Sequence, residues 1–278
     1  MFGAIIGDIA GSTLEFRQKK IYDFPMFIRG SDITDDTIMT VAVARALMQW
    51  RTRGGDLHDA MRQHMRDLGT RYPDPLGAYG IRFSNWLRGT DDAPYNSCGN
   101  GSAMRASPCG LAAGSLTEAL ELAKISAEVT HNHPEGIKGA QAIAAAVYLA
   151  KTGSSRKEIM EYIHSNFYPM DRTLEQIRPR YRFEDTCQKS VPESIIAFLE
   201  SDSFEDAIRK VISLGGDADT MGAITGSIAW SFYRVQSREG MPEDMRILRE
   251  KAMHYLPEDF RQTVADFDRM CMGGDSCE

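Results

Sequence analysis

The sequence predicts an all-α protein folded as one domain. Segments with apolar residues at helical spacing recur along the whole chain, and several open with a residue that commonly caps a helix. We find no convincing series of alternating strands, no internal repeat and no low-complexity segment. With 278 residues, 42% of them hydrophobic, the chain is long enough to bury a large core.

The overall charge and the apolar runs exclude two classes of function. A net charge of −7 argues against binding of bulk nucleic acid, which needs a positive surface, but leaves room for one nucleotide. No apolar run reaches the length of a membrane span. The N-terminus is apolar but lacks the basic residues of a signal peptide. We therefore expect a protein without membrane contact.

The cysteines indicate a reducing compartment. There are five, an odd number, and no two form a C-x-x-C pair. We expect reduced thiols and a cytoplasmic protein. Cys271 and Cys277, in a glycine-rich tail, could form an incidental bridge, to which we give little weight.

The segment 3–16 is the first expected helix. It carries Gly3, Gly7 and Gly11, four residues apart and therefore on one helical face. Because glycine has no side-chain carbon, we expect another helix to approach this face closely. The spacing is not the G-x-G-x-x-G of a dinucleotide-binding turn, and no strand pattern precedes it. Glu15 follows as a candidate site residue.

An acidic cluster opens the second expected helix. Residues 17–33 form an expected loop that leads to Thr34–Asp35–Asp36–Thr37. The segment after it, to about Trp50, is apolar on nearly every side, as in helices buried inside large helical proteins. Carboxylates at a helix start are stabilised by the free N–H groups and the helix dipole. An amphipathic helix is expected over residues 56–69.

Residues 70–100 form the longest irregular stretch that we expect. It contains many prolines and glycines and five aromatic residues: Tyr72, Tyr79, Phe83, Trp86 and Tyr95. Long aromatic loops in compact domains often bind ligands. Core packing is the competing interpretation, and it is the one that we favour for Phe83 and Trp86.

A glycine-rich motif, Gly99–Asn100–Gly101–Ser102–Ala103–Met104–Arg105, leads into a helix of small residues. Glycines at a helix start free backbone N–H groups for an anion such as phosphate. The motif lacks the Gly-Lys-Ser/Thr ending of a Walker loop. A phosphate site and a plain turn are therefore equal alternatives at this point.

Capping residues mark three more helices, over residues 115–129, 134–153 and 155–167. Between the first two lies His131, which we interpret as a hydrogen-bonding group and not as a metal ligand. Residues 168–192, with three prolines that include Pro192, are expected to form a connecting segment. Ser203 then caps a further helix, and residues 242–269 add one or two helices.

A second acidic cluster, Asp217–Ala218–Asp219–Thr220, follows the pair Gly215–Gly216. In a regular helix, residues two apart point to opposite sides. Asp217 and Asp219 can therefore converge only if the glycines bend the backbone there. We take this as the physical reason for the glycine pair.

The two acidic clusters together predict a metal site. Several carboxylates in one half-buried site repel strongly, whereas a helix dipole contributes only ~1 kcal/mol. A cation between them would offset the repulsion, and oxygen ligands without nearby His or Cys select Mg²⁺ or Mn²⁺. The alternative is that both clusters are ordinary helix caps in a structural protein.

Taken in order, these motifs resemble the ADP-ribosylglycohydrolase family, the relatives of dinitrogenase-reductase-activating glycohydrolase. The resemblance treats residues 1–278 as one domain and is strongest over 1–236. It is carried by Gly7–Asp8 with Glu15, Thr34–Thr37, Tyr79–Gly80, Gly99–Arg105, Thr130–His131 and Gly216–Thr220. It implies a single compact domain of orthogonally packed helices, with two divalent cations, Mg²⁺ or Mn²⁺, that hold the ribose of ADP-ribose.

The resemblance also implies a role for each motif residue. The implied metal ligands are Thr34, Asp35, Asp36, Asp217, Asp219 and Thr220. The implied catalytic carboxylates are Glu15 and Asp36. The implied contacts to the phosphates and riboses are Tyr79, Gly80, Asn100, Gly101, Ser102, Met104 and His131. The aromatic loop would then lie near the adenine or the leaving group.

The activity that follows is metal-assisted hydrolysis of an N- or O-glycosidic bond at the anomeric carbon of ADP-ribose. Carboxylates would stabilise an oxocarbenium-like transition state, and Glu15 or an aspartate would pass a proton to the leaving group. The acceptor that we favour is arginine on a protein. O-linked ADP-ribose (serine, poly- or O-acetyl forms), modified nucleic acid and small molecules stay open.

Two functions of other classes compete with this one. A non-catalytic ADP-ribose-binding module would keep the pocket, but it has no need of five carboxylates. A metal phosphohydrolase would cut the pyrophosphate and release AMP and ribose 5-phosphate.

Overall fold

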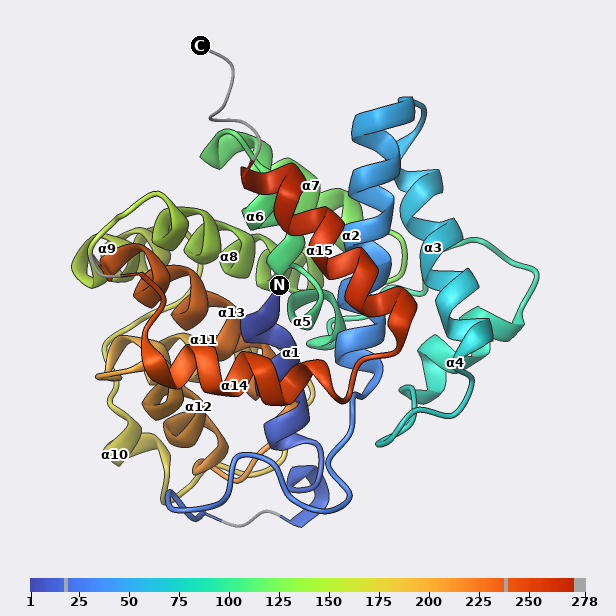
Figure 1. Cartoon of the computed structure of the whole chain (residues 1–278). Helices are drawn as coiled ribbons and strands as arrows, with labels where there is room; N and C mark the ends of the chain where they lie inside the picture. The colour runs from blue at the N-terminus through green and yellow to red at the C-terminus, as the bar shows by residue number, and fades with distance from the viewer. Residues whose placement is uncertain (18–19, 238–239, 273–278) are drawn as a thin grey trace.

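The computed structural model describes residues 1–17, 20–237 and 240–272. In these ranges the chain forms helices and no strand, apart from single bridges that pair Thr34 with Leu76 and Gly99 with Thr186. The helices (Figure 1) are α1 Phe2–Gly11, the short 3₁₀ helix Glu15–Arg17, α2 Asp35–Arg53, α3 Leu57–Arg71, α4 Ile81–Arg88, α5 Gly101–Met104, α6 Ser107–Ala112, α7 Leu116–Glu128, α8 Pro134–Lys151, α9 Arg156–Asn166, α10 Leu174–Ile177, α11 Cys187–Leu199, α12 Phe204–Ile212, α13 Ala218–Gln236, α14 Glu243–Met253 and α15 Glu258–Met272. The predicted all-α, single-domain fold is confirmed.

Helices α1 and α13 lie against each other at the centre of the fold, and α14 crosses α1 (Figure 1). The glycine face of α1 makes the close contact. A Cβ atom on any of its three glycines would overlap the α13 backbone, at Gly226 for Gly3, at Gly222 for Gly7 and at Ala218 for Gly11. The predicted close approach of a second helix is confirmed. The two helices are antiparallel, so the end of α1 meets the start of α13.

Helix α2 is buried over most of its length, as its apolar pattern predicts. Ile38, Met39, Val41 and Leu47 are at most 1% exposed. The helix packs on α1, α3, α6 and α15, and α13 also touches it. Its first turn therefore lies beside the first turn of α13, and the two acidic clusters meet inside the molecule.

Most helix starts are formed by the residues that mark them in the sequence. Ser155 and Glu158 make the full reciprocal capping box of α9, and Pro134 is the first residue of α8. At α7, the Ser115 hydroxyl accepts from the N–H of Glu118, as a capping box requires. The Glu118 carboxylate, however, accepts from the N–H of Gly114 (2.7 Å) and not from that of Ser115, so the box is not reciprocal. Residues 242–269 contain two helices, α14 and α15, which end the described chain.

The prediction of a connecting segment over residues 168–192 is wrong. It contains the short α10 and the start of α11, with Pro192 inside that helix. A proline there removes one helical hydrogen bond and costs about 3 kcal/mol. Val191, Ile195 and Phe198 are fully buried, and each stabilises the fold by about 1.5–3 kcal/mol. Burial of the apolar face therefore outweighs the proline.

The prediction of an irregular stretch over residues 70–100 is wrong for its middle, where α4 lies between Gly80 and Gly89. The helix has only eight residues, too few for a clear periodic pattern. Phe83 and Trp86 are buried with their ring centroids 5.6 Å apart. Their interpretation as core residues is confirmed.

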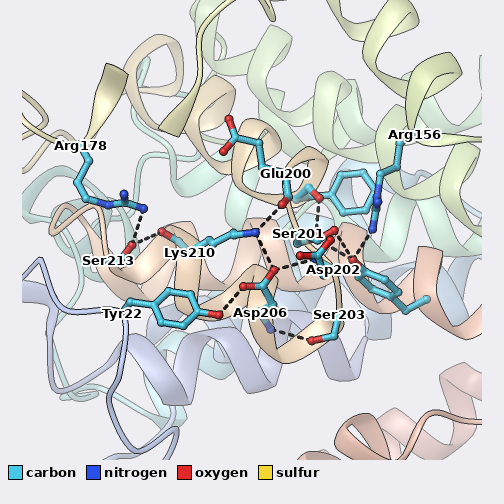
Figure 2. Close-up of polar contacts among 12 residues, drawn as sticks. Tyr22, Arg156, Arg178, Glu200, Ser201, Asp202, Ser203, Asp206, Lys210 and Ser213 are labelled. Atoms are coloured by element: carbon cyan, nitrogen blue, oxygen red, sulfur yellow. Dashed lines mark hydrogen bonds and ion pairs between the residues drawn. The ribbon is translucent and has the colours of Figure 1, made fainter. Parts of the chain in front are cut away.

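The loop before Thr34 is fastened to α12. Figure 2 shows Asp206, in the first turn of α12, accepting a hydrogen bond from the hydroxyl of Tyr22 (2.6 Å) and pairing with Lys210 (2.8 Å). Arg209 of the same helix donates to the carbonyl of Phe24 (2.6 Å) and lies over its ring. These contacts hold the segment that joins Glu15 to Thr34.

Four of the five cysteines lie in the described residues, and all four are free thiols: Cys98, Cys109, Cys187 and Cys271. Cys277, one half of the incidental bridge considered above, lies outside the described residues. Among the described helices none has the length and apolar character that crossing a membrane requires.

Candidate active site

The two acidic clusters, Glu15 and the glycine-rich motif line one cavity of about 510 Å³. Its acidic end is lined by Glu15, Asp35, Asp36, Asp217 and Asp219, together with Thr220. The other end carries aromatic side chains and the glycine-rich motif. The cavity lies where the end of α1 meets the starts of α2, α5 and α13.

Asp8, fully buried in α1, organises the start of α2. One of its oxygens, Oδ2, accepts from the backbone N–H groups of Thr34 (3.0 Å) and Thr37 (3.1 Å). The other, Oδ1, accepts from the Thr34 hydroxyl (2.8 Å). Thr34 is the N-cap residue of α2, and its hydroxyl oxygen also accepts from the N–H of Asp36 (3.2 Å). Asp8 therefore fixes the loop-to-helix turn that presents Asp35 and Asp36.

A hydrogen bond joins the two acidic clusters directly. The hydroxyl of Thr220, in the first turn of α13, donates to Oδ2 of Asp36 in the first turn of α2 (3.2 Å). The bonded residues are 184 positions apart in sequence. The expectation that the two clusters lie side by side is therefore met by the geometry.

Asp217 and Asp219 converge because the backbone bends before α13. Gly215 adopts a φ of +68°, which favours glycine, and Asp217 lies outside the helix as its N-cap residue. One carboxylate oxygen from each of Glu15, Asp217 and Asp219 lies within 4.8 Å of the others. Asn100 fixes Asp217 from the cavity side by donating to its Oδ2 (2.7 Å).

These carboxyl groups bind protons more tightly than free carboxyls do. Burial, with the charges of neighbouring aspartates second, raises the pKa of Glu15 to about 8 and that of Asp35 to about 8. Burial also raises the pKa of Asp36 and of Asp219 well above the ordinary value. The five carboxylates are therefore too close together and too deeply buried to be charged at the same time without a counter-charge.

The donor set fits divalent cations. Glu15 Oε2 and Asp36 Oδ1 are buried and have no hydrogen-bond partner. Within the described ranges none of the five carboxylates forms a salt bridge with Lys, Arg or His. Carboxylate and hydroxyl oxygens of this kind are the ligands that Mg²⁺ and Mn²⁺ prefer. A cation would satisfy the unpartnered oxygens and offset the repulsion.

Most of the predicted substrate-contact residues line the same cavity: Tyr79, Gly80, Asn100, Gly101, Met104 and His131. Ser102 does not line it, because its buried hydroxyl donates to the carbonyl of Gly136 (2.7 Å). Thr34 is likewise fully buried, behind Asp36 and against Asp8. The roles assigned to these residues stay predictions.

Several cavity residues were not singled out from the sequence. They are Arg82, whose guanidinium lies over the ring of Tyr95, and Phe183 and Asp185, which come from the segment predicted to be a connection. The carbonyl of Asp185 accepts from the N–H of Asn100 (2.7 Å). Nothing local in sequence marks Phe183 or Asp185. Asp8, named from the sequence only as part of the Gly7–Asp8 motif, carries a further signal as a lone acid within an apolar glycine helix.

The structure is thus an all-α domain with a carboxylate-lined cavity at the starts of α2, α5 and α13, and the oxygen groups of this cavity fit cations. Residues 1–271 match the family model described as ADP-ribosylglycohydrolase. The chain belongs to the ADP-ribosylglycohydrolase family and is a hydrolase of this class.

Relatives of this chain carry names of the same family, at low sequence identity to it. ADP-ribosyl-[dinitrogen reductase] glycohydrolase of Rhodospirillum rubrum is 27% identical, over 89% of this chain and 90% of its own length. ADP-ribosylarginine hydrolase Tri1 of Pseudomonas putida (strain GB-1) is 24% identical, over 88% and 71%. ADP-ribosylhydrolase ARH3 of Gallus gallus is 26% identical, over 83% of each.

A solved structure supports the fold. A chain of an ADP-ribosylglycohydrolase-related protein complex superposes with a TM-score of 0.64 at 23% identity, covering 91% of this chain and 95% of that one. At this identity the likeness concerns the fold alone.

Proposed function

We propose that this protein is a divalent-cation-dependent hydrolase that cleaves the glycosidic bond between ADP-ribose and an acceptor. The observation that carries the proposal is the convergence of five carboxylates, without a basic partner among the described residues, at one end of a cavity of about 510 Å³. The cavity has the size of a small-molecule site. Family membership supplies the reaction class.

The groups that would hold two cations, Mg²⁺ or Mn²⁺, are the four aspartates with the hydroxyl of Thr220, which lines the cavity. Thr34, predicted as a further ligand, is fully buried, and its hydroxyl donates to Asp8. Bound cations would supply the positive charge that neutralises this end of the cavity and holds the ribose hydroxyls of the substrate. Asp8 and Asn100 keep the ligand set in place, because they fix Thr34 and Asp217 by hydrogen bonds.

The chain's own residues would orient the substrate and move the proton. The glycine-rich motif lines the cavity with Asn100 and Gly101, and the absence of a side chain at Gly101 would let the diphosphate approach the backbone. Tyr79 and Tyr95 line the cavity and would offer rings to the adenine.

The carboxylates would stabilise the oxocarbenium-like transition state electrostatically. Glu15 would pass a proton from Oε2, which is buried in the site without a hydrogen-bond partner, to the leaving group. Asp36 is the alternative proton-transfer group.

For the acceptor we infer arginine on a protein. The relatives named ADP-ribosylarginine hydrolase and ADP-ribosyl-[dinitrogen reductase] glycohydrolase support this choice. A guanidinium group is also a cation, which an acidic cavity end attracts. O-linked ADP-ribose is the second candidate, supported by the match to ADP-ribosylhydrolase ARH3.

A linkage panel tests the proposal. Proteins or peptides carrying ADP-ribose on arginine and on serine, poly-ADP-ribose and O-acetyl-ADP-ribose are incubated with the enzyme and Mg²⁺ or Mn²⁺, and products are identified by mass. We expect free ADP-ribose, fastest from arginine, and no release in EDTA.

Asp35→Ala and Asp219→Ala are expected to lower release at least 10²-fold, as loss of a metal ligand or transition-state contact does. Full activity of both variants, or in EDTA, would rule out the cation mechanism. AMP and ribose 5-phosphate as products would indicate a phosphohydrolase. Tight ADP-ribose binding without turnover of any linkage would indicate a binding module.

A further inference from the structure

Three buried polar side chains are hydrogen-bonded in series beside the cavity. Arg105 Nη2 lies 2.8 Å from the hydroxyl oxygen of Thr130, and this oxygen lies 2.7 Å from Nδ1 of His131. Arg105, Thr130 and His131 are 1%, 0% and 6% exposed. Arg105 and His131 both line the cavity, and Nε2 of His131 lies beside the cavity residues Gly99 and Gly101.

Arg105 is a cation held without a counter-ion. In the described part of the chain it has no salt bridge, and its Nη2 donates instead to the carbonyl of Ser126 (3.0 Å) and to Thr130. Burial lowers the pKa of Arg105, but only to about 10, so the guanidinium stays charged at neutral pH. A donor of this kind polarises the hydroxyl that it bonds, which makes that hydroxyl a better donor.

The Thr130 hydroxyl has one proton and two lone pairs to share. Arg105 can only donate, so it occupies one lone pair. The positive charge of Arg105 on that lone pair disfavours a second N–H donor, from His131 Nδ1, on the other lone pair. The remaining group, the hydroxyl proton of Thr130, then points to His131 Nδ1.

We propose that Arg105 and Thr130 are positioning residues that fix His131 as the neutral tautomer with its proton on Nε2. Nδ1 accepts from Thr130, so Nε2 must carry the hydrogen. The motif glycines lie against this atom. A Cβ atom on Gly101 would lie 3.1 Å from Nε2, and one on Gly99 would lie 3.5 Å from it.

The assignment deepens the function proposed above, on which its ligand part rests. A neutral Nε2–H group is a donor, and its partner in the cavity is an oxygen acceptor. The diphosphate and ribose oxygens of ADP-ribose are such acceptors, whereas a metal ion would need the bare nitrogen. His131 therefore binds substrate as a fixed donor and takes no part as a metal ligand.

The surroundings of His131 keep the ring neutral. Burial acts first, and the charges of Arg105 and Arg82 second, to hold the pKa of His131 well below its usual value. Tyr95, whose ring centroid is 5.8 Å from that of His131, is the other titratable group against it, and burial raises the pKa of this phenol to about 12. The ring therefore faces two cations and a neutral phenol.

The first test is spectroscopic and needs no ligand. The full chain is labelled with ¹⁵N-histidine, and the ring nitrogens of its six histidines are observed from pH 5.5 to 8.5. A His131→Gln variant identifies the resonances of His131. We expect a neutral ring with the proton on Nε2 at every pH. A proton on Nδ1, or titration near the usual pKa, overturns the proposal.

The second test removes the Thr130 hydroxyl and keeps the shape of the side chain. Thr130→Val, which lacks the hydroxyl, is expected to leave His131 without one fixed tautomer and to weaken ADP-ribose binding about ten-fold. Thr130→Ser keeps the hydroxyl and is the matched control, expected to retain both the Nε2–H signal and the affinity. Unchanged tautomer and affinity in Thr130→Val overturn the proposal.

The two tests separate this inference from the proposed function. If Thr130→Val fails to fold by circular dichroism, the wild-type resonances still decide the tautomer. If ADP-ribose does not bind the wild-type protein in calorimetry, the proposed function fails, whereas the ligand-free spectrum still decides whether Arg105 and Thr130 fix the ring.

Discussion

At the scale of single residues, the site depends on side chains that do not themselves face the cavity. Asp8 is fully buried, and burial raises its pKa to about 6 despite the hydrogen bonds from Thr34 and Thr37. Its three donors all belong to the turn that presents the acidic cluster of α2. Removal of this carboxylate leaves buried donors unsatisfied, which is more damaging than loss of an exposed charge.

Asp8→Ala is expected to lower the free energy of unfolding by about 2–3 kcal/mol, because two backbone N–H groups and one hydroxyl lose their acceptor. Asp8→Asn, which keeps one acceptor oxygen, is expected to lose about half of that. The control is Asp23→Ala, since the Asp23 side chain is fully exposed and should change stability little. Urea unfolding measures all three, and equal effects of Asp8→Ala and Asp23→Ala would refute the role given to Asp8.

Gly77 is a second residue on which the site depends, because it lines the cavity and lies against Glu15. Its φ is +81°, and a Cβ atom there would lie 2.9 Å from Oε2 of Glu15. We expect Gly77→Ala to lose about 1 kcal/mol of stability and to lower kcat more than ten-fold, by displacing Glu15. Gly55→Ala is the matched control, with a φ of +93° and open space, beyond the far end of α2. Steady-state kinetics and thermal unfolding, measured on both variants, distinguish the effect of backbone strain from that of displacing Glu15.

At the scale of elements, the antiparallel contact of α1 and α13 sets the distance between the acidic groups. The glycine spacing in residues 3–16 predicts a close helix partner but not which helix it is. The partner is identified only in three dimensions, where Gly222 and Gly226 of α13 oppose Gly7 and Gly3. Helix starts with Ser caps are local features and were predictable. The start of α11 depends on burial by distant helices, so its sequence, with Pro192, gave the wrong prediction.

Gly7→Ala and Gly222→Ala are each expected to destabilise the protein by about 2–4 kcal/mol, because an added methyl meets backbone that cannot move aside. Both changes should also lower the activity of the folded fraction, since they push α1 and α13 apart where the acidic residues meet. Gly114→Ala is the control: its Cβ would make only ordinary contact, 3.5 Å from Glu118. Thermal unfolding curves measure the effect, and near-neutral substitutions at positions 7 and 222 would contradict the packing argument.

At the scale of the whole molecule, the acidic end of the site was predictable and the other end was only partly so. Acid pairs at helix starts stand out in sequence, because Asp35, Asp36, Asp217 and Asp219 lie next to strongly apolar helices. At the aromatic end, the loop with Tyr79 and Tyr95 stands out in sequence, whereas the segment with Phe183 and Asp185 has no local signal. Phe183 and Asp185 reach the cavity only because the chain after residue 185 pairs with Gly99.

The same whole-molecule arrangement predicts how stability depends on pH and on cations. Asp8, Glu15 and Asp35 have folded-state pKa values of about 6, about 8 and about 8, above the values near 4 of the unfolded chain. A carboxyl whose pKa is raised by folding stabilises the fold fully below its unfolded pKa, and this contribution disappears as the pH rises through the folded pKa. In EDTA, the Tm should therefore fall by about 5 °C or more between pH 5 and pH 8.5.

Cations should remove this dependence, because they favour the charged carboxylates and bind only the folded chain. We expect millimolar Mg²⁺ or Mn²⁺ to raise the Tm strongly at pH 8.5, weakly at pH 5, and more than Na⁺ of equal ionic strength does. Asp35→Asn with Asp219→Asn removes two of the charges, so the double variant should be more stable than wild type in EDTA at pH 8.5 and should gain little from Mg²⁺. A wild-type Tm that is flat with pH in EDTA and unmoved by divalent ions would mean that the five carboxylates are ordinary helix caps, and the cation-dependent mechanism would have no physical basis.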